Sequence, residues 1–467
     1  MKKKWVAGAG LIKLISLALA GLLCAGMGGC SPKPIQEEKT VDTQVLRVGI
    51  ISDTQLAPKG GSDVYDSYLK GALELLKQKE IHMLIHAGDY TDVGLADAYQ
   101  NFKDIYEGVY PGNSSPMKLF IMGNHDYWLS DFVKCWEIPF KGKMRRRMEK
   151  YTGESPWSHK VLNGYHFIGL SPVNGSMEDD AYEGKLEWAE EEIQKAIAAA
   201  PSRPVFVITH NNPKDTVYTS DDYGDSKLDA LFAKYPQVIS ISGHTHASIL
   251  DERSISQTSY TAINTQSLSY TDFEEGALLE EPGDVEANPM CMIMEIADNQ
   301  ITIRRYSVLG GQEEKEPWVI PLPIDQTQFS YTDQARAQQR KAPAWPQDAK
   351  AAFSKEGERQ LLTFPAATHE DFVHSYRIVL SDSNGKAVSF GEGGRSEGGA
   401  DLYQRFLCGN RKNVKVGAAE SCGRIKSGAC RQLYGNDLRA GVFRQGKRAD
   451  YMPGDGFLNS LRVQFFV

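Results

Sequence analysis

The sequence contains no closely spaced cysteine pair and no excess of positive charge. Its seven cysteines show no Cys-x-x-Cys spacing and two of them lie in the N-terminal leader, so they give little support for a disulfide framework. The formal net charge is −8, which gives no electrostatic reason to expect nucleic-acid binding. With 41% hydrophobic and 24% charged residues among 467, the composition is typical of a globular protein of two or three domains.

The N-terminus has the layout of a secretory signal. Three lysines open the chain, and a mostly apolar run follows as far as Gly29. The small residues before Cys30 are similar to the lipobox of bacterial lipoproteins. We therefore predict a signal peptide over 1–30, lipid attachment at Cys30, a polar tether over 31–44 and a location outside the cytoplasm, anchored at the cell membrane. Secretion after cleavage near Cys30 is the alternative interpretation.

Short apolar runs alternate with helical stretches from residue 45 onward. The runs predict strands over 45–52, 82–87, 118–122, 166–171, 204–209 and 238–242. The stretches between them predict helices over 64–79, 96–106, 185–199 and 226–234. Later runs predict strands without helices over 260–264, 290–296 and 301–308. This alternation indicates an α/β fold, to which the later strands add a second sheet.

A different composition follows these strands. Residues 311–357, which include a stretch rich in Pro, Gln, Glu and Lys, are predicted to form a linker. Residues 358–385 are expected to begin a small β domain, with a strand over 376–380 and a hairpin turn at Asn384-Gly385. The segment 364–380 resembles the opening of a fibronectin-type-III-like domain, which implies spacing or surface adhesion rather than catalysis.

The last 82 residues, 386–467, form a basic, glycine-rich tail. They hold 14 Lys and Arg against 7 Asp and Glu, and 14 of them are glycine. One interpretation is a disordered tail that binds anionic polymers at the cell surface. The other is a shift of the coding frame near Lys386, because the local patterns agree with no single fold. The small β domain is therefore expected to be incomplete.

Five of the apolar runs end in side chains that bind metals well. They are followed by Asp53-Thr54-Gln55, Gly88-Asp89, Gly123-Asn124-His125-Asp126, His210-Asn211-Asn212 and Gly243-His244-Thr245-His246. Ligands of open α/β sheets bind outside the carboxyl ends of the strands, so parallel strands bring these side chains to one edge. Imidazole and carboxylate ligands together suit Zn, Fe or Mn. Each motif alone is weak evidence, and their order along the chain makes the site specific.

Local geometry favours close approach to an ion. Glycines directly precede Asp89, Asn124 and His244, which lets the backbone turn sharply there. In an extended segment His244 and His246 point to the same face, so one ion or an adjacent pair can collect both. Asp53 and Gln55 have the same spacing.

The ordered motifs resemble those of the calcineurin-like metallophosphoesterase superfamily over about residues 45–310. This resemblance implies a four-layer αββα sandwich of two sheets flanked by helices, with two metal ions, and hydrolysis of phosphomonoesters or phosphodiesters. It implies that one metal is held by Asp53, Gln55, Asp89 and His246. It implies that the other is held by Asp89, Asn124, His210 and His244, so that Asp89 bridges the pair.

The resemblance also assigns His125 as the acid or charge-stabilising group, with Asp126 supporting it. One departure is Gln55, which stands where the family motif usually has histidine. An amide oxygen is a neutral, weaker ligand, so looser metal binding is expected at that position.

The alternative function is a catalytically silent, metal-containing surface-binding protein. The expected partners are a phosphate-ester substrate and, through the lipid anchor, the membrane. The sequence sets neither the substrate nor the oligomeric state.

Neighbouring polar and aromatic residues have two interpretations each. His82 and His86 are expected to be structural histidines rather than ligands. Asp92 is expected to help a helix begin or to support the site. Asn211 and Asn212 either shape a turn or contact substrate phosphate, and the aromatic residues Tyr127, Trp128 and Trp157 either pack in the core or line a substrate cleft.

Overall fold

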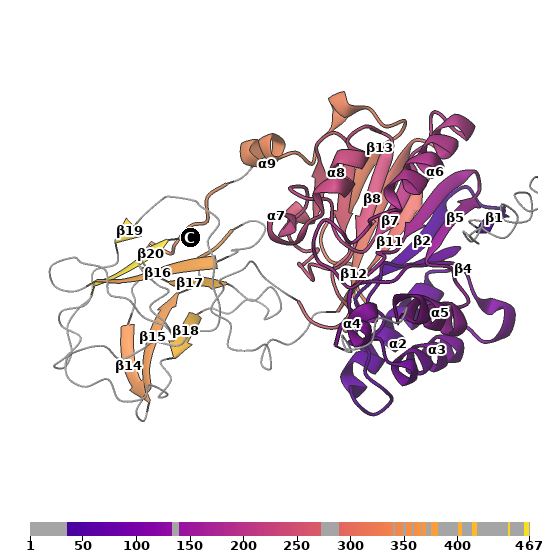
Figure 1. Cartoon of the computed structure of the whole chain (residues 1–467). Helices are drawn as coiled ribbons and strands as arrows, with labels where there is room; N and C mark the ends of the chain where they lie inside the picture. Colours follow the sequence, from indigo (N-terminus) through magenta and orange to yellow (C-terminus); the bar gives the residue numbers. More distant parts are fainter. Residues whose placement is uncertain are drawn as a thin grey trace, which may run out of the picture.

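The computed structural model describes residues 35–132, 140–271, 289–339, 341–347 and 349. Further along the chain it describes the short stretches 352–356, 359–365, 367–369, 375–381, 400–403, 413–417, 447–448 and 462–466. Figure 1 shows the N-terminal two thirds as stacked sheets covered by helices. Among the residues described, no helix is both long and apolar enough to cross a bilayer.

A six-stranded sheet carries the first three candidate metal-binding motifs. Its order is β13-β12-β11-β2-β3-β4, and β2, β3 and β4 are parallel. The strands are β2 (Leu46–Ile51), β3 (Met83–His86), β4 (Met117–Phe120), β11 (Met290–Ile296), β12 (Gln300–Ser307) and β13 (Trp318–Pro321). The parallel strands end at the same edge, where the motifs begin.

A seven-stranded sheet carries the last two motifs. Its order is β1-β5-β6-β7-β8-β10-β9, and β6, β7, β8 and β10 are parallel. The strands are β1 (Ile35–Lys39), β5 (Trp157–Leu162), β6 (Tyr165–Leu170), β7 (Val205–Thr209), β8 (Val238–Ser242), β9 (Ile255–Gln257) and β10 (Thr261–Asn264). The two sheets pack face to face through one apolar core.

Alternation along the strands explains this layering. In β2, Val48 and Ile50 face the core between the sheets, whereas Ile51 faces the helices. In β7, Phe206 faces the core between the sheets and Val207 faces the other helix layer. Because both faces of each central strand are covered, the strands are apolar throughout rather than alternating.

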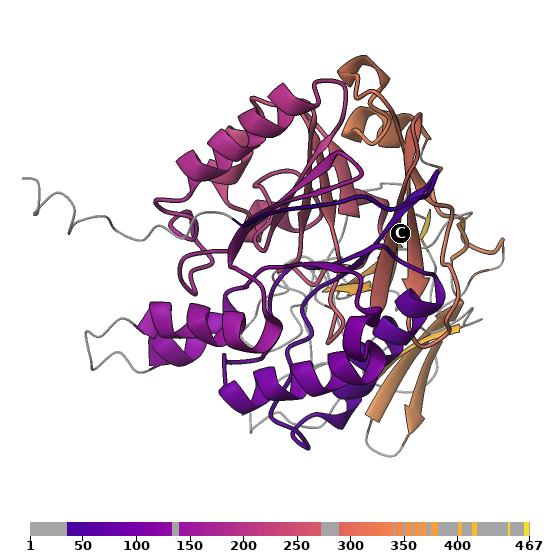
Figure 2. The same cartoon turned by 90° about the vertical axis from the view of Figure 1, so that its right-hand side faces the viewer.

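Helices cover the outer face of each sheet. α2 (Asp63–Gln78), α3 (Ala96–Val109), α4 (His125–Phe132) and α5 (Phe140–Thr152) lie on the six-stranded sheet. α6 (Leu186–Ala199) and α8 (Ser226–Phe232) lie on the seven-stranded sheet, near the short helix α7 (Ser220–Tyr223). Figure 2 shows the helices on opposite sides of the paired sheets. The predicted four-layer αββα sandwich is therefore confirmed.

The predicted tether needs a correction. Residues 35–39 form β1, which pairs in parallel with β5 at the edge of the seven-stranded sheet. The carboxylate of Glu37 lies 3.0 Å from Nζ of Lys160 on β5, so the charge that indicated a tether is used in an ion pair. The 31–44 segment is thus partly a strand.

The boundary predicted at residue 310 also needs a correction. β13 pairs antiparallel with β12, so the six-stranded sheet extends to Pro321, and α9 (Asp333–Gln339) follows. Trp318 of β13 is buried and donates from Nε1 to Glu252, 2.6 Å away. Its side chain belongs to the core between the sheets, so the segment predicted as a linker begins as part of the two-sheet sandwich.

The C-terminal third contributes two small sheets. One has the order β14-β15-β18 and the other β17-β16-β20-β19. The strands are β14 (Ala352–Glu356), β15 (Arg359–Pro365), β16 (Ser375–Ser381), β17 (Ala400–Tyr403), β18 (Asn413–Gly417), β19 (Lys447–Arg448) and β20 (Arg462–Phe466). β16 matches the expected strand, and β17 to β20 fall inside the basic tail. The predicted turn at 384–385 lies outside the described residues, as do Cys30 and the predicted signal peptide.

Candidate metal centre

All seven candidate metal ligands lie at the edge where the two sheets meet. Asp53, Asp89 and Asn124 follow β2, β3 and β4 of one sheet, and His210 and His244 follow β7 and β8 of the other. Most are buried, with exposed fractions of 0–4%, and His244 is half-buried. The fold thus brings together side chains that lie up to 193 positions apart in the sequence, from residue 53 to residue 246.

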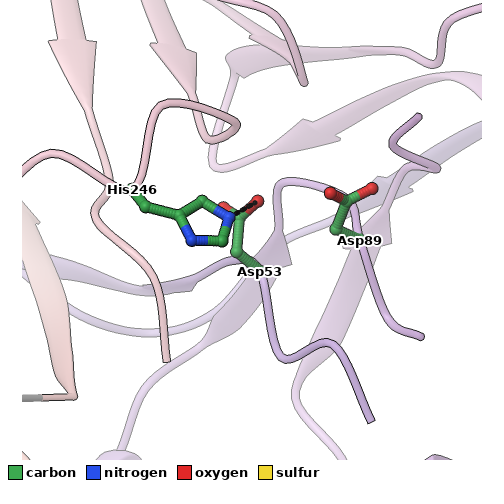
Figure 3. Close-up of side chains that lie close together, drawn as sticks. All are labelled: Asp53, Asp89 and His246. Carbon is green, nitrogen blue, oxygen red and sulfur yellow. Dashed lines mark ion pairs between the residues drawn. The ribbon is translucent and has the colours of Figure 1, made fainter. Parts of the chain in front are cut away.

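One half of the centre is built around Asp53. Its Oδ1 lies 3.2 Å from Nε2 of His246, and Figure 3 shows this pair beside the carboxylate of Asp89. Nε2 of Gln55 lies 3.3 Å from Nε2 of His246. Ligand atoms of Asp53, Asp89 and His246 all lie within 4.8 Å of one another, which is close enough to share one ion.

The other half is built around Asn124. Its Oδ1 lies 2.8 Å from Nε2 of His210 and 3.1 Å from Nδ1 of His244. Nε2 of His210 is also 3.3 Å from Oδ2 of Asp89. The backbone N–H of His244 donates to the Asp53 carboxylate, 3.2 Å away, and so links the two halves.

Several buried ligand atoms lack a hydrogen-bond partner among the described residues. They are Nε2 of His244 and Nδ1 of His246, and Oδ2 of Asp89 has only ion-pair contacts with His210 and His125. An unpaired buried polar atom is costly, and a bound cation removes the cost at an oxygen or an unprotonated ring nitrogen. The donor set of carboxylates, amides and imidazoles therefore fits metal ions.

The backbone of the centre is held in an unusual conformation. Five candidate ligands have a left-handed backbone: Asp53 (φ 52), Gln55 (φ 42), Asp89 (φ 57), His244 (φ 77) and His246 (φ 51). Such conformations cost free energy and persist where the surrounding structure imposes them, most often at functional sites. The pairs Asp53/Gln55 and His244/His246 are therefore not in the extended conformation that the sequence argument assumed.

Glycine is required where strands lead into the centre. A Cβ atom at Gly123 would overlap Oδ1 of Asp89, and one at Gly243 would overlap the side chains of Ser52 and Asp53. The close approach expected from the sequence is therefore present, because no other residue leaves room for these carboxylates.

Burial and charge act in opposite directions on the ionisable groups. Against the effect of burial, the His246 imidazole lowers the pKa of Asp53, and His210 likewise lowers the pKa of Asp89. Burial lowers the pKa of His244 to about 3, so this ring is neutral at pH 7. Against burial, the Asp89 carboxylate raises the pKa of His210 to about 9. Metal binding at His210 would therefore release a proton.

His210 is oriented by atoms outside the centre. Its Nδ1 lies 2.9 Å from the carbonyl oxygen of Ala87, so Nδ1 carries the proton and Nε2 faces Asn124. The hydroxyl of Tyr182 accepts from the backbone N–H of His210 at 3.0 Å. These contacts fix the nitrogen that is available to a metal.

The family comparison agrees with this geometry. Residues 46–248 match the family model for calcineurin-like phosphoesterases. This part of the chain is a calcineurin-like phosphoesterase domain. No curated protein matches the chain.

Solved structures similar to this chain are remote in sequence. GAP50, described as the anchor in the inner membrane complex of Plasmodium, is 16% identical with a TM-score of 0.39. The match covers 64% of the present chain and 94% of the GAP50 chain. Purple acid phosphatase PPD1 from yellow lupin seeds is 15% identical with a TM-score of 0.42, covering 62% and 55%. Vacuolar Protein Sorting 29 from Cryptosporidium parvum is 13% identical with a TM-score of 0.31, covering 60% and 100%.

His125 is half-buried beside the candidate metal centre. Its Nε2 lies 3.9 Å from Oδ2 of Asp89 and 3.3 Å from Nε2 of Gln55. Its Nδ1 lies 2.7 Å from the backbone oxygen of Asp92, which holds the ring with Nε2 toward the centre. Against burial, Asp89 and Asp92 raise the pKa of His125, so the protonated form is favoured.

Asp126 holds loops rather than the ring of His125. Its carboxylate accepts from the N–H of Gly123 at 3.0 Å, the N–H of Tyr90 at 3.3 Å and the hydroxyl of Thr91 at 3.2 Å. Burial and the nearby Asp89 raise the pKa of Asp126 to about 7. Asp92 is the residue that contacts Nδ1 of His125, whereas Asp126 shapes the motif loops around Asp89, so support of His125 by Asp126 stays a prediction.

The segment after β10 was missed at the sequence level. Ser267 donates to the backbone oxygen of Asp53 at 3.0 Å, and the Ser269 hydroxyl lies 3.5 Å from Oε1 of Gln55. The ring of Tyr270 lies 4.3 Å from that of His246. The available signal was the same as for the other motifs, because β10 is a short run that ends in the polar stretch Asn264-Thr265-Gln266-Ser267.

The remaining candidates have structural surroundings. His86 is buried and its ring stacks on Tyr90 at 4.0 Å, and Nδ1 of His82 accepts from the N–H of Arg47 at 3.0 Å. Nε1 of Trp157 donates to the backbone oxygen of Ser171 at 2.9 Å. Asn212 is fully buried, and neither side-chain polar atom has a hydrogen-bond partner among the described residues.

Proposed function

We propose that this chain is a phosphoesterase that uses two metal ions and acts outside the cytoplasm. The observation that carries the proposal is a continuous series of contacts that joins seven candidate ligands from both sheets: Asp53, Gln55, Asp89, Asn124, His210, His244 and His246. A purely structural polar cluster would form hydrogen bonds with all of its own atoms, whereas Nε2 of His244 and Nδ1 of His246 have no hydrogen-bond partner in the part of the chain that the structure describes.

The residues divide into two groups around Asp89. Asp53, Gln55 and His246 would hold one ion with Asp89, and Asn124, His210 and His244 would hold the other. When bound, such ions polarise phosphoryl oxygens and lower the pKa of a bound water. Mn, Fe and Zn all accept this mixture of oxygen and nitrogen ligands.

His125 supplies the proton or positive charge for the leaving group. Because Nδ1 is held by the backbone oxygen of Asp92, the proton that His125 can transfer is the one on Nε2, which faces the centre. Asp89 and Asp92 raise the pKa of His125 against the effect of burial, which favours the protonated form that an acid needs. An alkoxide that leaves phosphorus beside Asp89 is therefore within reach of an acid.

The proposed location depends on the N-terminal leader. The basic start, the apolar run and the small residues before Cys30 support export and acylation at that cysteine. Cys30→Ala is expected to move the protein from the membrane fraction to the soluble fraction. Equal membrane association of the variant and the parent would contradict the lipid anchor.

The decisive test is hydrolysis by the purified protein. We expect release of p-nitrophenol from p-nitrophenyl phosphate or bis-p-nitrophenyl phosphate when Mn, Zn or Fe is added to metal-free protein. Asp89→Asn keeps the shape of the side chain but removes the charge between the two ion positions, and should abolish hydrolysis and metal retention. Absence of hydrolysis with every metal, with metal still bound, would favour a silent binding protein.

A further inference from the structure

Three aromatic side chains surround the metal centre, and each one contacts a different histidine. Trp128 lies on α4, Tyr223 at the end of α7 and Tyr270 in the segment after β10. These segments come from opposite layers of the sandwich, so the rings lie around the centre rather than in one patch. All three side chains are half-buried, which leaves part of each ring accessible.

The contacts differ in geometry. The ring of Trp128 stacks on that of His125, with centroids 3.5 Å apart and planes at 28°. Tyr270 lies 4.3 Å from His246 at 52°. Tyr223 meets His244 edge to face, 6.3 Å away at 88°. One face or edge of each ring is therefore used to support the centre.

The positions of these rings suit recognition of a flat group. Aromatic rings provide apolar area at low entropic cost and stack on other planar rings. They do not attract phosphate, whose charge is met by the metal ions and by His125. A ring beside the leaving-group acid is placed to contact what the phosphate is attached to. Fixing a histidine requires only the contacted part of each ring, so the accessible part is available for substrate.

We infer that the substrate is a phosphate ester whose esterified group carries a planar, unsaturated ring, as a nucleotide does. This inference rests on the proposed phosphoesterase function and adds the substrate class. Trp128 and Tyr270 are the recognition residues, because Trp128 stacks on His125, which lies next to Gln55, and the tilted ring of Tyr270 contacts His246, which lies next to Asp53. Tyr223 closes the side next to His244.

The test compares two probes that share the same scissile bond. Adenosine 5′-monophosphate and ribose 5-phosphate differ in the base, and their methyl phosphodiesters provide the same comparison for a diesterase. Base stacking on aromatic side chains corresponds to a preference of about 5- to 150-fold in kcat/KM for the base-bearing probe. Trp128→Leu and Tyr270→Leu should each reduce this ratio toward one, whereas Trp128→Phe and Tyr270→Phe should retain most of it.

Tyr235→Leu provides the matched control. Tyr235 is a half-buried aromatic residue whose hydroxyl contacts Glu190 on α6, away from the centre, and its loss should leave the ratio unchanged. Metal content measured on every variant separates recognition from collapse of the centre. Equal use of both probes by the parent protein would overturn the inference. So would an equal loss on both probes in Trp128→Leu and Tyr270→Leu, which would mean that the rings only hold the histidines.

A binding measurement covers the case in which neither probe is hydrolysed. Titration calorimetry of the manganese-loaded protein with the two probes reports base preference without turnover. Tighter binding of the base-bearing probe, lost in Trp128→Leu, would support ring recognition while the proposed catalysis fails. Equal affinity, or no binding of either probe, would overturn the recognition itself.

Discussion

Nε2 of Gln55 lies 3.3 Å from Nε2 of His125. The residue that replaces the usual first-motif histidine therefore contacts the proposed acid, while the same nitrogen also lies 3.3 Å from Nε2 of His246. To bind a metal through oxygen, the amide must turn its Oε1 from Ser269 toward Asp53. Gln55 is thus placed to influence both metal binding and the orientation of His125.

Gln55→His is expected to tighten binding of the ion held by Asp53 and His246. An imidazole is a stronger ligand for Zn than a neutral amide oxygen, and changes around metal sites commonly alter affinity by about 10–100-fold. Zinc titration of metal-free protein by calorimetry measures this change at each of the two sites. Gln55→Leu, which has no ligand atom, should weaken the same site. Unchanged affinity in both variants would show that Gln55 does not contact the metal.

His125→Ala should retain both metals and lose about 10²–10⁴ in kcat, the usual contribution of an acid or base. The reason is that the ring contacts the centre through Nε2 without being one of the seven ligands. Elemental analysis and steady-state kinetics on the same sample check the prediction. A variant that loses its metals instead would place His125 among the ligands.

Gly123→Ala should remove metal from the centre, because its Cβ would overlap the Asp89 carboxylate. Gly108→Ala is the matched control, since it lies exposed on α3 with no atom within 4 Å of its new Cβ. That change should stabilise the protein by about 0.5–1 kcal/mol through helix propensity. The two variants are compared by manganese content and by the midpoint of thermal unfolding. Full metal content in Gly123→Ala would mean that the loop can shift without cost.

Stability should fall in acid because of His86. Burial lowers the pKa of this histidine from 6.5 to about 3, so the unfolded chain binds a proton that the folded chain does not. Above pH 6.5 the titration of His86 does not reduce the free energy of unfolding. As the pH falls from 6.5 toward 3, it reduces the free energy of unfolding by about 1.4 kcal/mol per pH unit. Urea unfolding across this range measures the slope. His86→Asn keeps an acceptor near Gly88 but cannot titrate, and should show a shallower slope. If the unfolding free energy of His86→Asn has the same pH slope as that of the parent protein, other groups cause the acid sensitivity.

The strands that could be predicted from the sequence were those made of an uninterrupted run of apolar residues. β3 and β7 are buried on both faces, so their runs appear directly in the sequence. β5 was missed because it contains Ser158, His159 and Lys160, which are buried only with tertiary partners. His159 lies 2.6 Å from Glu192 on α6, and Lys160 lies 2.6 Å from Glu154. Such pairs satisfy buried polar groups, but sequence patterns do not reveal them.

The centre was predictable for a different reason. Each candidate ligand follows a strand directly, so parallel strands dictate where the side chains meet. Asp92 holds His125 through its backbone oxygen, 2.7 Å from Nδ1, and its carboxylate lies 3.6 Å from the same nitrogen. The backbone contact carries no signal in the residue type, and the carboxylate contact depends on a loop conformation that the sequence pattern does not reveal. The sequence also did not assign a role to the aromatic rings around the centre. Whether Trp128 packs in the core or faces the substrate depends on the opposite layer of the sandwich, which the sequence pattern does not show. The frame of the tail after Lys386 is a question for gene resequencing.

With the lipid anchor proposed at Cys30, the parallel pairing of β1 with β5 would limit the distance between the domain and a bilayer. A lipid on Cys30 would leave four residues, 31–34, before the first strand begins at Ile35. A chain of that length spans at most about 18 Å from Cys30 to Ile35 even when fully extended. In an anchored protein, the β1 edge of the seven-stranded sheet would therefore lie against the lipid headgroups. A long flexible tether would instead let the domain move far from the membrane surface.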